Sequence, residues 1–103
     1  FTGPDINDYL QTYNISMAFM ACTGVTMKSG LTNASAEEYI TKKAIAENAN
    51  SMILLADHSK FGRISLMTYS SMEKLDAIVT DQPLPEEYDS FCQEHGIRVM
   101  TID

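Results

Sequence analysis

Positively charged residues are scarce in this 103-residue chain. Seven lysines and arginines stand against fourteen aspartates and glutamates, which gives a formal net charge of -7. Proteins that bind nucleic acids contact phosphates through clustered lysine and arginine side chains. Here these residues are scattered, and only Lys42 and Lys43 are adjacent. The charge pattern therefore argues against nucleic-acid binding by this segment.

Long hydrophobic runs are absent as well. No apolar run approaches the roughly 18 residues of a membrane span, and the start lacks the basic and apolar regions of a signal peptide. We therefore expect a cytoplasmic protein with no membrane partner. The chain opens at Phe1 without a methionine, so we expect a piece of a longer protein or a trimmed chain.

Cysteine is also rare, with only Cys22 and Cys92, 70 positions apart. Neither has a metal-ligating neighbour at zinc-site spacing, so we expect neither a metal nor a cofactor. A disulfide is possible on the count alone. The favoured interpretation is two reduced thiols, one in an apolar strand and one on a helix face.

The overall composition is that of an ordinary globular domain, with 45% hydrophobic and 20% charged residues. A chain of this length buries roughly two-thirds of its unfolded surface, which is enough for a core of its own. We therefore predict a single domain, or part of one, over residues 1–103.

Helical and extended patterns alternate along the chain. Helical patterns or signals occur at residues 4–14, 35–48 and 82–96, and a short helical turn is predicted at 72–75. Apolar runs typical of buried strands occur at 15–22, 51–56, 77–81 and 97–102. This alternation predicts an α/β fold: a mostly parallel sheet with helices on its faces.

Three details of this prediction can be checked individually. The polar stretch 23–33, which holds Gly24 and Gly30, is predicted to be a loop. Ser35 begins a capping box, in which the Glu38 side chain reaches back to the cap and also pairs with Lys42. Residues 64–69 are predicted to form a short strand or an extended segment without clean alternation.

Polar side chains follow three of the predicted strands, at Thr23-Gly24, at residues 57–60 and at Thr80-Asp81. Ligands of open parallel sheets bind beyond the carboxyl ends of the strands. Asp57, Ser59 and Lys60 offer a carboxylate, a hydroxyl and an ammonium, a set that suits a phosphorylated polyol. The alternative role of Asp57 is to cap the following turn, and the residues alone do not decide between the two.

Other polar residues give weaker signals. The segment 24–32 leads to a helix N-terminus, where backbone amides bind anions, but a plain connecting loop is the favoured interpretation. Glu37 and Glu38 are general-base candidates, although acids in a first helical turn are usually structural. His58 has no identifiable partner and is interpreted as a solvated turn histidine. His95 complements the dipole of its helix.

The stretch from Leu54 to Gly62, LLADHSKFG, resembles the hallmark of the effector-sensing domain of the DeoR family of bacterial sugar-metabolism repressors. Further pieces match in the same order: AFMA followed by Gly24, SGLT at residues 29–32, Glu38 and Lys42 before an Ala-Ile helix, and IVTD at 78–81. The resemblance covers nearly the whole chain. The residues of this stretch, with the many Met and Asn residues of the chain, resemble those of lactose-type repressors.

This resemblance implies the fold of ribose-5-phosphate isomerase, a three-layer α/β arrangement that is partial here. It implies an effector-binding domain that senses a phosphorylated sugar, of the tagatose 6-phosphate or fructose 1-phosphate type, and a homo-oligomer. Operator DNA would be bound only by an N-terminal winged helix-turn-helix that this chain lacks. The implied ligand contacts are Asp57, Ser59 and Lys60, with Thr23, Gly24 and Thr32 contributing more weakly.

Two alternatives to a sensor stay open at this point. One is a small sugar-phosphate isomerase or deaminase, in which a positioned base moves a proton between neighbouring sugar carbons. The related isomerases carry carboxylates where this sequence reads Cys22-Thr23-Gly24-Val25-Thr26, so we predict that the chain is not an enzyme. The other alternative is an oligomerisation module with a degenerate pocket.

Overall fold

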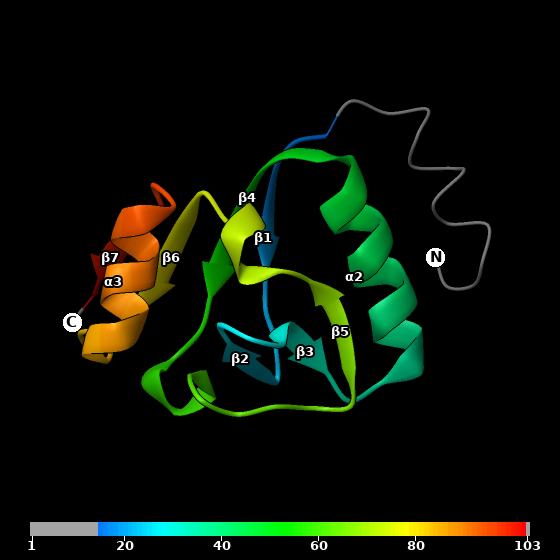
Figure 1. Ribbon diagram of the computed structural model, residues 1–103. Coiled ribbons are helices and arrows are strands. Elements are labelled where there is room, and N and C mark those ends of the chain that lie inside the picture. Colours follow the sequence, from blue (N-terminus) through cyan, green and yellow to red (C-terminus); the bar gives the residue numbers. More distant parts are fainter. Residues whose placement is uncertain (1–14, 103) are drawn as a thin grey trace.

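The computed structural model describes residues 15–102, and the helix predicted at residues 4–14 lies outside this range. Figure 1 shows the order of the elements along the chain. In that order they are β1 (Ile15–Met20), β2 (Gly24–Thr26), β3 (Gly30–Asn33), α2 (Ala36–Asn48), β4 (Ala49–Leu55), η1 (His58–Lys60), β5 (Met67–Ser70), η2 (Met72–Lys74), β6 (Ala77–Thr80), α3 (Glu86–Glu94) and β7 (Arg98–Thr101).

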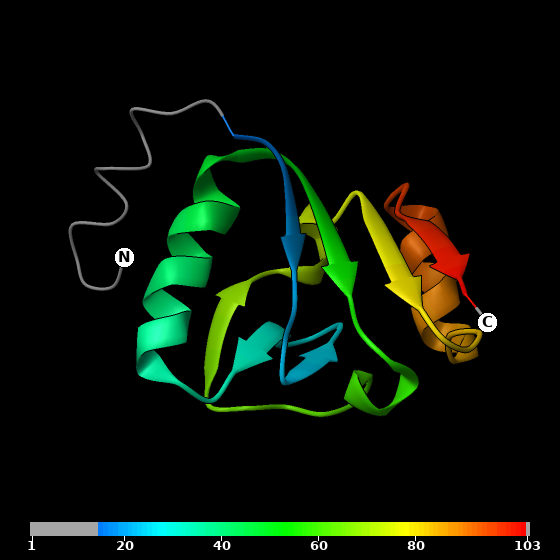
Figure 2. The same ribbon diagram turned by 180° about the vertical axis from the view of Figure 1, so that it is seen from behind.

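The main sheet has four parallel strands in the order β1-β4-β6-β7. All four strands come from the apolar runs that predicted them, and Figure 2 shows them side by side. Leu54 and Ile78, which face each other across β4 and β6, are completely buried. The predicted α/β class with a mostly parallel sheet is therefore confirmed.

Helix α2 begins as predicted, but two of its expected side-chain contacts are wrong. Ser35 is the N-cap, and its hydroxyl accepts a hydrogen bond from the Glu38 backbone N–H at 3.4 Å. The Glu38 carboxylate instead accepts from the Asn33 side-chain amide at 3.0 Å. The Lys42 ammonium donates to the Ala21 carbonyl and to Asn33. The side chain of Asn33 thus contacts both Glu38 and Lys42, which do not pair with each other as predicted.

Helix α3 also follows the prediction. Its inner face buries Tyr88 and Cys92, and Gly96 adopts the left-handed conformation (φ +68°) that ends the helix before β7. Cys22 and Cys92 are both free and buried, in agreement with two reduced thiols. Cys22 lies just beyond β1 rather than within the strand, which ends at Met20.

The prediction of a loop over residues 23–33 is wrong. Strands β2 and β3 form an antiparallel hairpin, and β5 adds to β3 to give a second sheet of three strands. The hairpin strands have only three and four residues, yet Val25, Leu31 and Thr32 are completely inaccessible to solvent. Tertiary burial, rather than local propensity, forms these strands. The segment 64–69 contributes to β5, which starts at Met67.

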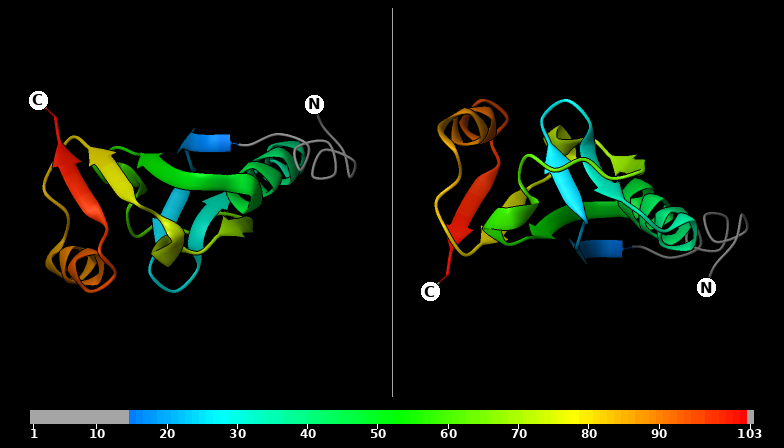
Figure 3. Two further views of the ribbon diagram at one scale, coloured as in Figure 1. Left: turned by 90° about the horizontal axis from the view of Figure 1, so that it is seen from above. Right: turned by 90° about the horizontal axis from the view of Figure 1, so that it is seen from below.

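The layers are clearest in the views along the sheet (Figure 3). Helix α3 and the small sheet lie on one face of the main sheet. The buried core is formed by side chains of the main sheet, the small sheet and α3. Helix α2 packs against β5 and β1. On the opposite face, the described part of the chain leaves apolar side chains exposed: Met17, Phe19, Leu55, Met100 and Ile102.

Candidate functional site

The carboxyl ends of β1, β4 and β6 meet at one edge of the main sheet because these strands are parallel. The residues that follow them are the polar strand-end residues of the sequence, of which Asp57, Thr23 and Gly24 were expected to bind ligand. Thr23 and Gly24 follow β1, Asp57 follows β4, and Asp81 follows β6. The structure therefore gathers the predicted strand-end residues at the sheet edge where α/β proteins bind ligands.

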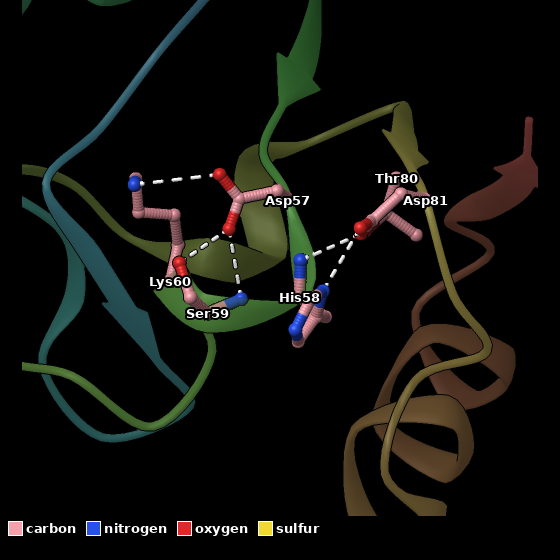
Figure 4. Close-up of polar contacts among 6 residues, drawn as sticks. All are labelled: Asp57, His58, Ser59, Lys60, Thr80 and Asp81. Atoms are coloured by element: carbon pink, nitrogen blue, oxygen red, sulfur yellow. Dashed lines mark hydrogen bonds and ion pairs between the residues drawn. The ribbon is translucent and has the colours of Figure 1, made fainter.

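Residues 57–60, here termed the Asp57–Lys60 turn, form a compact cluster of polar side chains (Figure 4). Asp57 caps η1: its Oδ1 accepts hydrogen bonds from the backbone N–H of Ser59, at 2.8 Å, and from the Ser59 hydroxyl. Its Oδ2 lies 3.5 Å from the Lys60 ammonium. The hydrogen bonds from Ser59 hold the pKa of Asp57 below its usual value. Asp57 thus does cap the turn, as the alternative reading had it.

The side chains of this cluster remain accessible to a ligand. Half of the Asp57 side chain and about a third of the Lys60 side chain are exposed, at 50% and 31%. Lysine carries three donors, and the single ion pair to Asp57 is long. The turn therefore presents an ammonium and a hydroxyl, which are groups that bind phosphate. Next to them it presents a carboxylate, a group that binds sugar hydroxyls.

His58 has a partner that the sequence interpretation missed. Its backbone N–H donates to Asp81 Oδ1 at 2.7 Å, and its Nδ1 lies 2.8 Å from Asp81 Oδ2. These hydrogen bonds lower the pKa of Asp81. His58 is thus an exposed turn histidine, as predicted, but it has a partner that the sequence did not identify. The sequence placed both residues after parallel strands, but it did not show that β4 and β6 are direct neighbours.

The three weaker candidates lie on or beside the small hairpin. The Thr23 hydroxyl donates to Asn33 Oδ1 at 3.3 Å. Gly24 packs against the chain after η1, where an added Cβ would lie 2.3 Å from the Arg63 carbonyl oxygen. Thr32 is buried, and its hydroxyl donates to the Gly24 carbonyl and accepts from the Ser65 backbone N–H, both at 2.9 Å. Thr32 therefore supports the backbone of this region.

A second polar network, which sequence reasoning did not find, surrounds the Ala21 carbonyl after β1. The Lys42 ammonium and the Tyr69 hydroxyl both donate to this oxygen at 2.9 Å. Lys42 also donates to Asn33 Oδ1 at 3.1 Å. A cavity of about 370 Å³ opens beside the network between β1 and α2. Its lining combines the apolar side chains of Phe19, Met20, Ala21 and Ile45 with Glu37, Glu38, Thr41 and Lys42.

Cys22 directly follows Ala21, whose carbonyl accepts the hydrogen bonds of this network. Burial raises the pKa of its thiol to about 11, although the nearby ammonium groups of Lys42 and Lys60 act in the opposite direction. Both cations therefore lie within electrostatic range of the segment that follows β1. Among residues 15–102, no group of three His, Cys, Asp or Glu side chains could hold a metal ion.

Comparison with known proteins identifies the family. A family model described as the DeoR C terminal sensor domain matches residues 1–82. The chain belongs to this DeoR sensor family. The resemblance carried by the LLADHSKFG stretch is thereby confirmed. In the part of this DeoR sensor chain that the structure describes, no helix is long and apolar enough to cross a membrane.

The curated relatives are transcriptional regulators. The HTH-type transcriptional regulator IolR of Bacillus subtilis is 50% identical over 99 residues, which is 96% of this chain and 39% of IolR. The regulator GlpR of Haloferax volcanii is 29% identical over 98 residues, covering 95% of this chain and 38% of GlpR. The glycerol-3-phosphate regulon repressor of Escherichia coli is 29% identical over 92 residues, covering 89% and 36%.

The DeoR sensor chain thus spans about two-fifths of the length of these relatives. The matching family and these relatives are transcriptional regulators and not enzymes, which confirms the prediction that the chain is not an enzyme. The resemblance to lactose-type repressors in particular stays a prediction.

Proposed function

We propose that the chain is the effector-binding domain of a DeoR-type repressor that senses a phosphorylated sugar or polyol. The Asp57–Lys60 turn carries this proposal because it presents an ammonium, a hydroxyl and a carboxylate together at the carboxyl edge of the parallel sheet. Sensor-family membership supports a regulatory rather than a catalytic use of the site.

Each site residue has a proposed role. Lys60 neutralises the phosphate, and the ionised Asp57 accepts hydrogen bonds from sugar hydroxyls. The Ser59 hydroxyl, which donates to Asp57 in the structure, rotates to donate to the phosphate instead. Thr23 and Gly24 follow the neighbouring strand β1 and contribute more weakly. Thr32, whose hydroxyl is bound to Gly24 and Ser65, contributes by holding the backbone at Gly24.

The effector is proposed to be a small phosphate ester. Tagatose 6-phosphate and fructose 1-phosphate are the candidates that the family resemblance suggests. Glycerol 3-phosphate joins them because one relative is named a glycerol-3-phosphate regulon repressor. All three pair a phosphate group with two or more hydroxyl groups, and this is the chemistry that Lys60 and Asp57 complement.

The partners of the whole regulator are also proposals. Operator DNA binds to a winged helix-turn-helix outside these residues, in keeping with the HTH-type names of the relatives and the net charge of -7. The regulator works in the cytoplasm. It assembles as a homo-oligomer, and the exposed apolar face around Phe19 and Ile102 supports such association. Light scattering after size-exclusion chromatography measures the number of subunits.

Thermal unfolding tests the proposal directly. The chain, and the longer protein that contains it, are melted with each ester and with the corresponding unphosphorylated compound. We expect one ester to raise the melting temperature while its parent sugar or polyol does not. For the longer protein, the same ester changes the affinity for operator DNA, because an effector must bind the DNA-competent and DNA-incompetent states unequally. Absence of any ester-dependent stabilisation in both proteins rejects the proposal.

A further inference from the structure

Asp81 lies directly after β6 and holds His58, the first residue of η1, at two points. One carboxylate oxygen accepts from the His58 backbone N–H at 2.7 Å, and the other lies 2.8 Å from the ring nitrogen Nδ1. Because β4 and β6 are parallel neighbours, this contact ties the end of one strand to the turn that follows the other. A single carboxylate therefore fixes both the main chain and the ring of His58.

The main chain just before Asp57 is fixed as well. The backbone N–H of Ala56 donates to the Val79 carbonyl at 3.1 Å, which extends the hydrogen-bonding of the two strands one residue past β4. Asp57 is thus held between this hydrogen bond at Ala56 and the Asp81 contact at His58. Its carboxylate is then presented to Ser59 and Lys60.

The two sets of contacts point in different directions. Figure 4 shows Asp57 with Ser59 and Lys60 on one side of the turn, and His58 with Asp81 on the other. Within the described part of the chain, Asp81 makes no hydrogen bond or ion pair with Ser59 or Lys60, and it acts on the turn through His58. About half of each partner is exposed, 55% of the His58 side chain and 43% of that of Asp81, so the contact is not part of the core.

We infer that Asp81 is a positioning residue for effector binding, which orders the Asp57–Lys60 turn through His58 without contacting the phosphate ester. This inference rests on the function proposed for the turn. A turn that is already ordered loses less conformational freedom when a ligand binds, so its affinity is higher. Removal of Asp81 therefore weakens binding although the groups that touch the ester are unchanged.

The experiment titrates each variant with glycerol 3-phosphate, tagatose 6-phosphate and fructose 1-phosphate. The readout is the thermal stabilisation that each ester produces. Asp81→Ala removes both contacts with His58, and we expect a dissociation constant about tenfold higher, the scale set by two lost hydrogen bonds. Asp81→Asn keeps an oxygen for the His58 N–H and places an amide opposite Nδ1, which accepts in its other tautomer. We expect this variant to stay within about twofold of wild type.

His58→Ala is a second route to the same answer because it removes the ring contact and keeps the backbone contact. We expect a loss of affinity between those of the two Asp81 variants. The control is Asp89→Ala, which makes the same charge change on α3, where Asp89 contacts Gln93. Its affinity should match that of the wild type. The melting temperatures without ester should be similar for all four variants, because the altered side chains are exposed.

The possible failures are distinguishable. If the wild-type protein is stabilised by none of the three esters, the proposed function fails. If the wild type is stabilised and Asp81→Ala binds the same ester equally well, the positioning role is overturned while the proposed function stands. An equal loss in Asp81→Ala and Asp81→Asn also overturns it, because the amide retains both contacts.

Discussion

Replacement of Lys60 by alanine separates the binding role of the Asp57–Lys60 turn from its structural role. The ammonium lies 3.5 Å from Asp57, and both side chains are substantially exposed. Exposed ion pairs of this kind contribute little to stability, so we expect the melting temperature of unliganded Lys60→Ala to stay within about 2 °C of wild type.

The effect on the effector response is much larger. A hydrogen bond to a charged group contributes about 1.5–3 kcal/mol, which corresponds to roughly 10- to 150-fold in affinity. At 100 times the dissociation constant, an ester adds about 2.7 kcal/mol to the stability of the wild type, or roughly 10 to 20 °C for a domain of this size. After a 100-fold loss of affinity the same concentration adds only about 0.4 kcal/mol. The expected shift is then about 2 to 3 °C.

The assay is thermal unfolding at a fixed ester concentration, with Lys74→Ala as the matched control. Lys74 belongs to η2, which precedes β6, and so lies toward the opposite end of the main sheet from the Asp57–Lys60 turn. The control makes the same charge change and should retain the full ester response. An undiminished response in Lys60→Ala would refute the reasoning, because it would show that no phosphate contact depends on this ammonium.

The remaining predictions concern the hairpin and the thiols. Thr32→Val leaves the Ser65 N–H without its buried acceptor and should lower the free energy of unfolding by about 1–3 kcal/mol in denaturant titrations; an unchanged midpoint would contradict the hydrogen bonds described. Gly24→Ala places a Cβ 2.3 Å from the Arg63 carbonyl oxygen, and we expect a loss of about 1–3 kcal/mol in the same titration, whereas wild-type stability would show that the backbone yields freely. Cys22 and Cys92 are buried, and the pKa of the Cys22 thiol is raised to about 11. We therefore expect a disulfide reagent at pH 8 to react with both thiols only after the protein unfolds. Fast labelling of the native protein would contradict this burial.

The main sheet and its helices were predictable because their signals are local and strong. Continuous apolar runs predicted β4 and β6, although the described residues cover only one face of the main sheet and leave Leu55 of β4 exposed. Ser35 at the start of α2 and Gly96 after α3 were recognisable because capping chemistry depends on a few neighbouring residues.

The hairpin was not predictable from its own residues. Strands β2 and β3 together contain seven residues, among them polar Thr32 and Asn33, and such a stretch reads as a loop. The structure buries these polar groups because each finds a partner: Thr32 bonds to Gly24 and Ser65, and Asn33 to Glu38. Ser65 is 33 residues from Thr32, and a partner so distant in sequence is supplied by the tertiary fold, which local patterns do not reveal.

For the candidate site, the sequence located the residues but not their connections. The strand-end positions of Asp57 and Asp81 follow from the predicted order of strands, so their convergence was foreseeable. The pairing of His58 with Asp81 was not, because it depends on β4 and β6 being direct neighbours. The same limit applies to Lys42, whose ammonium reaches Ala21 across the space between α2 and β1.

The measurement that tests the central claim most directly is an amide chemical-shift titration of isotopically labelled protein. Glycerol 3-phosphate, tagatose 6-phosphate and fructose 1-phosphate are each compared with their unphosphorylated parents. We predict that one ester shifts the backbone amides of residues 57–60 and of Thr23 and Gly24, and that its parent compound does not. Unchanged amides at residues 57–60 with every ester, or shifts confined to the exposed sheet face around Phe19, would contradict the account.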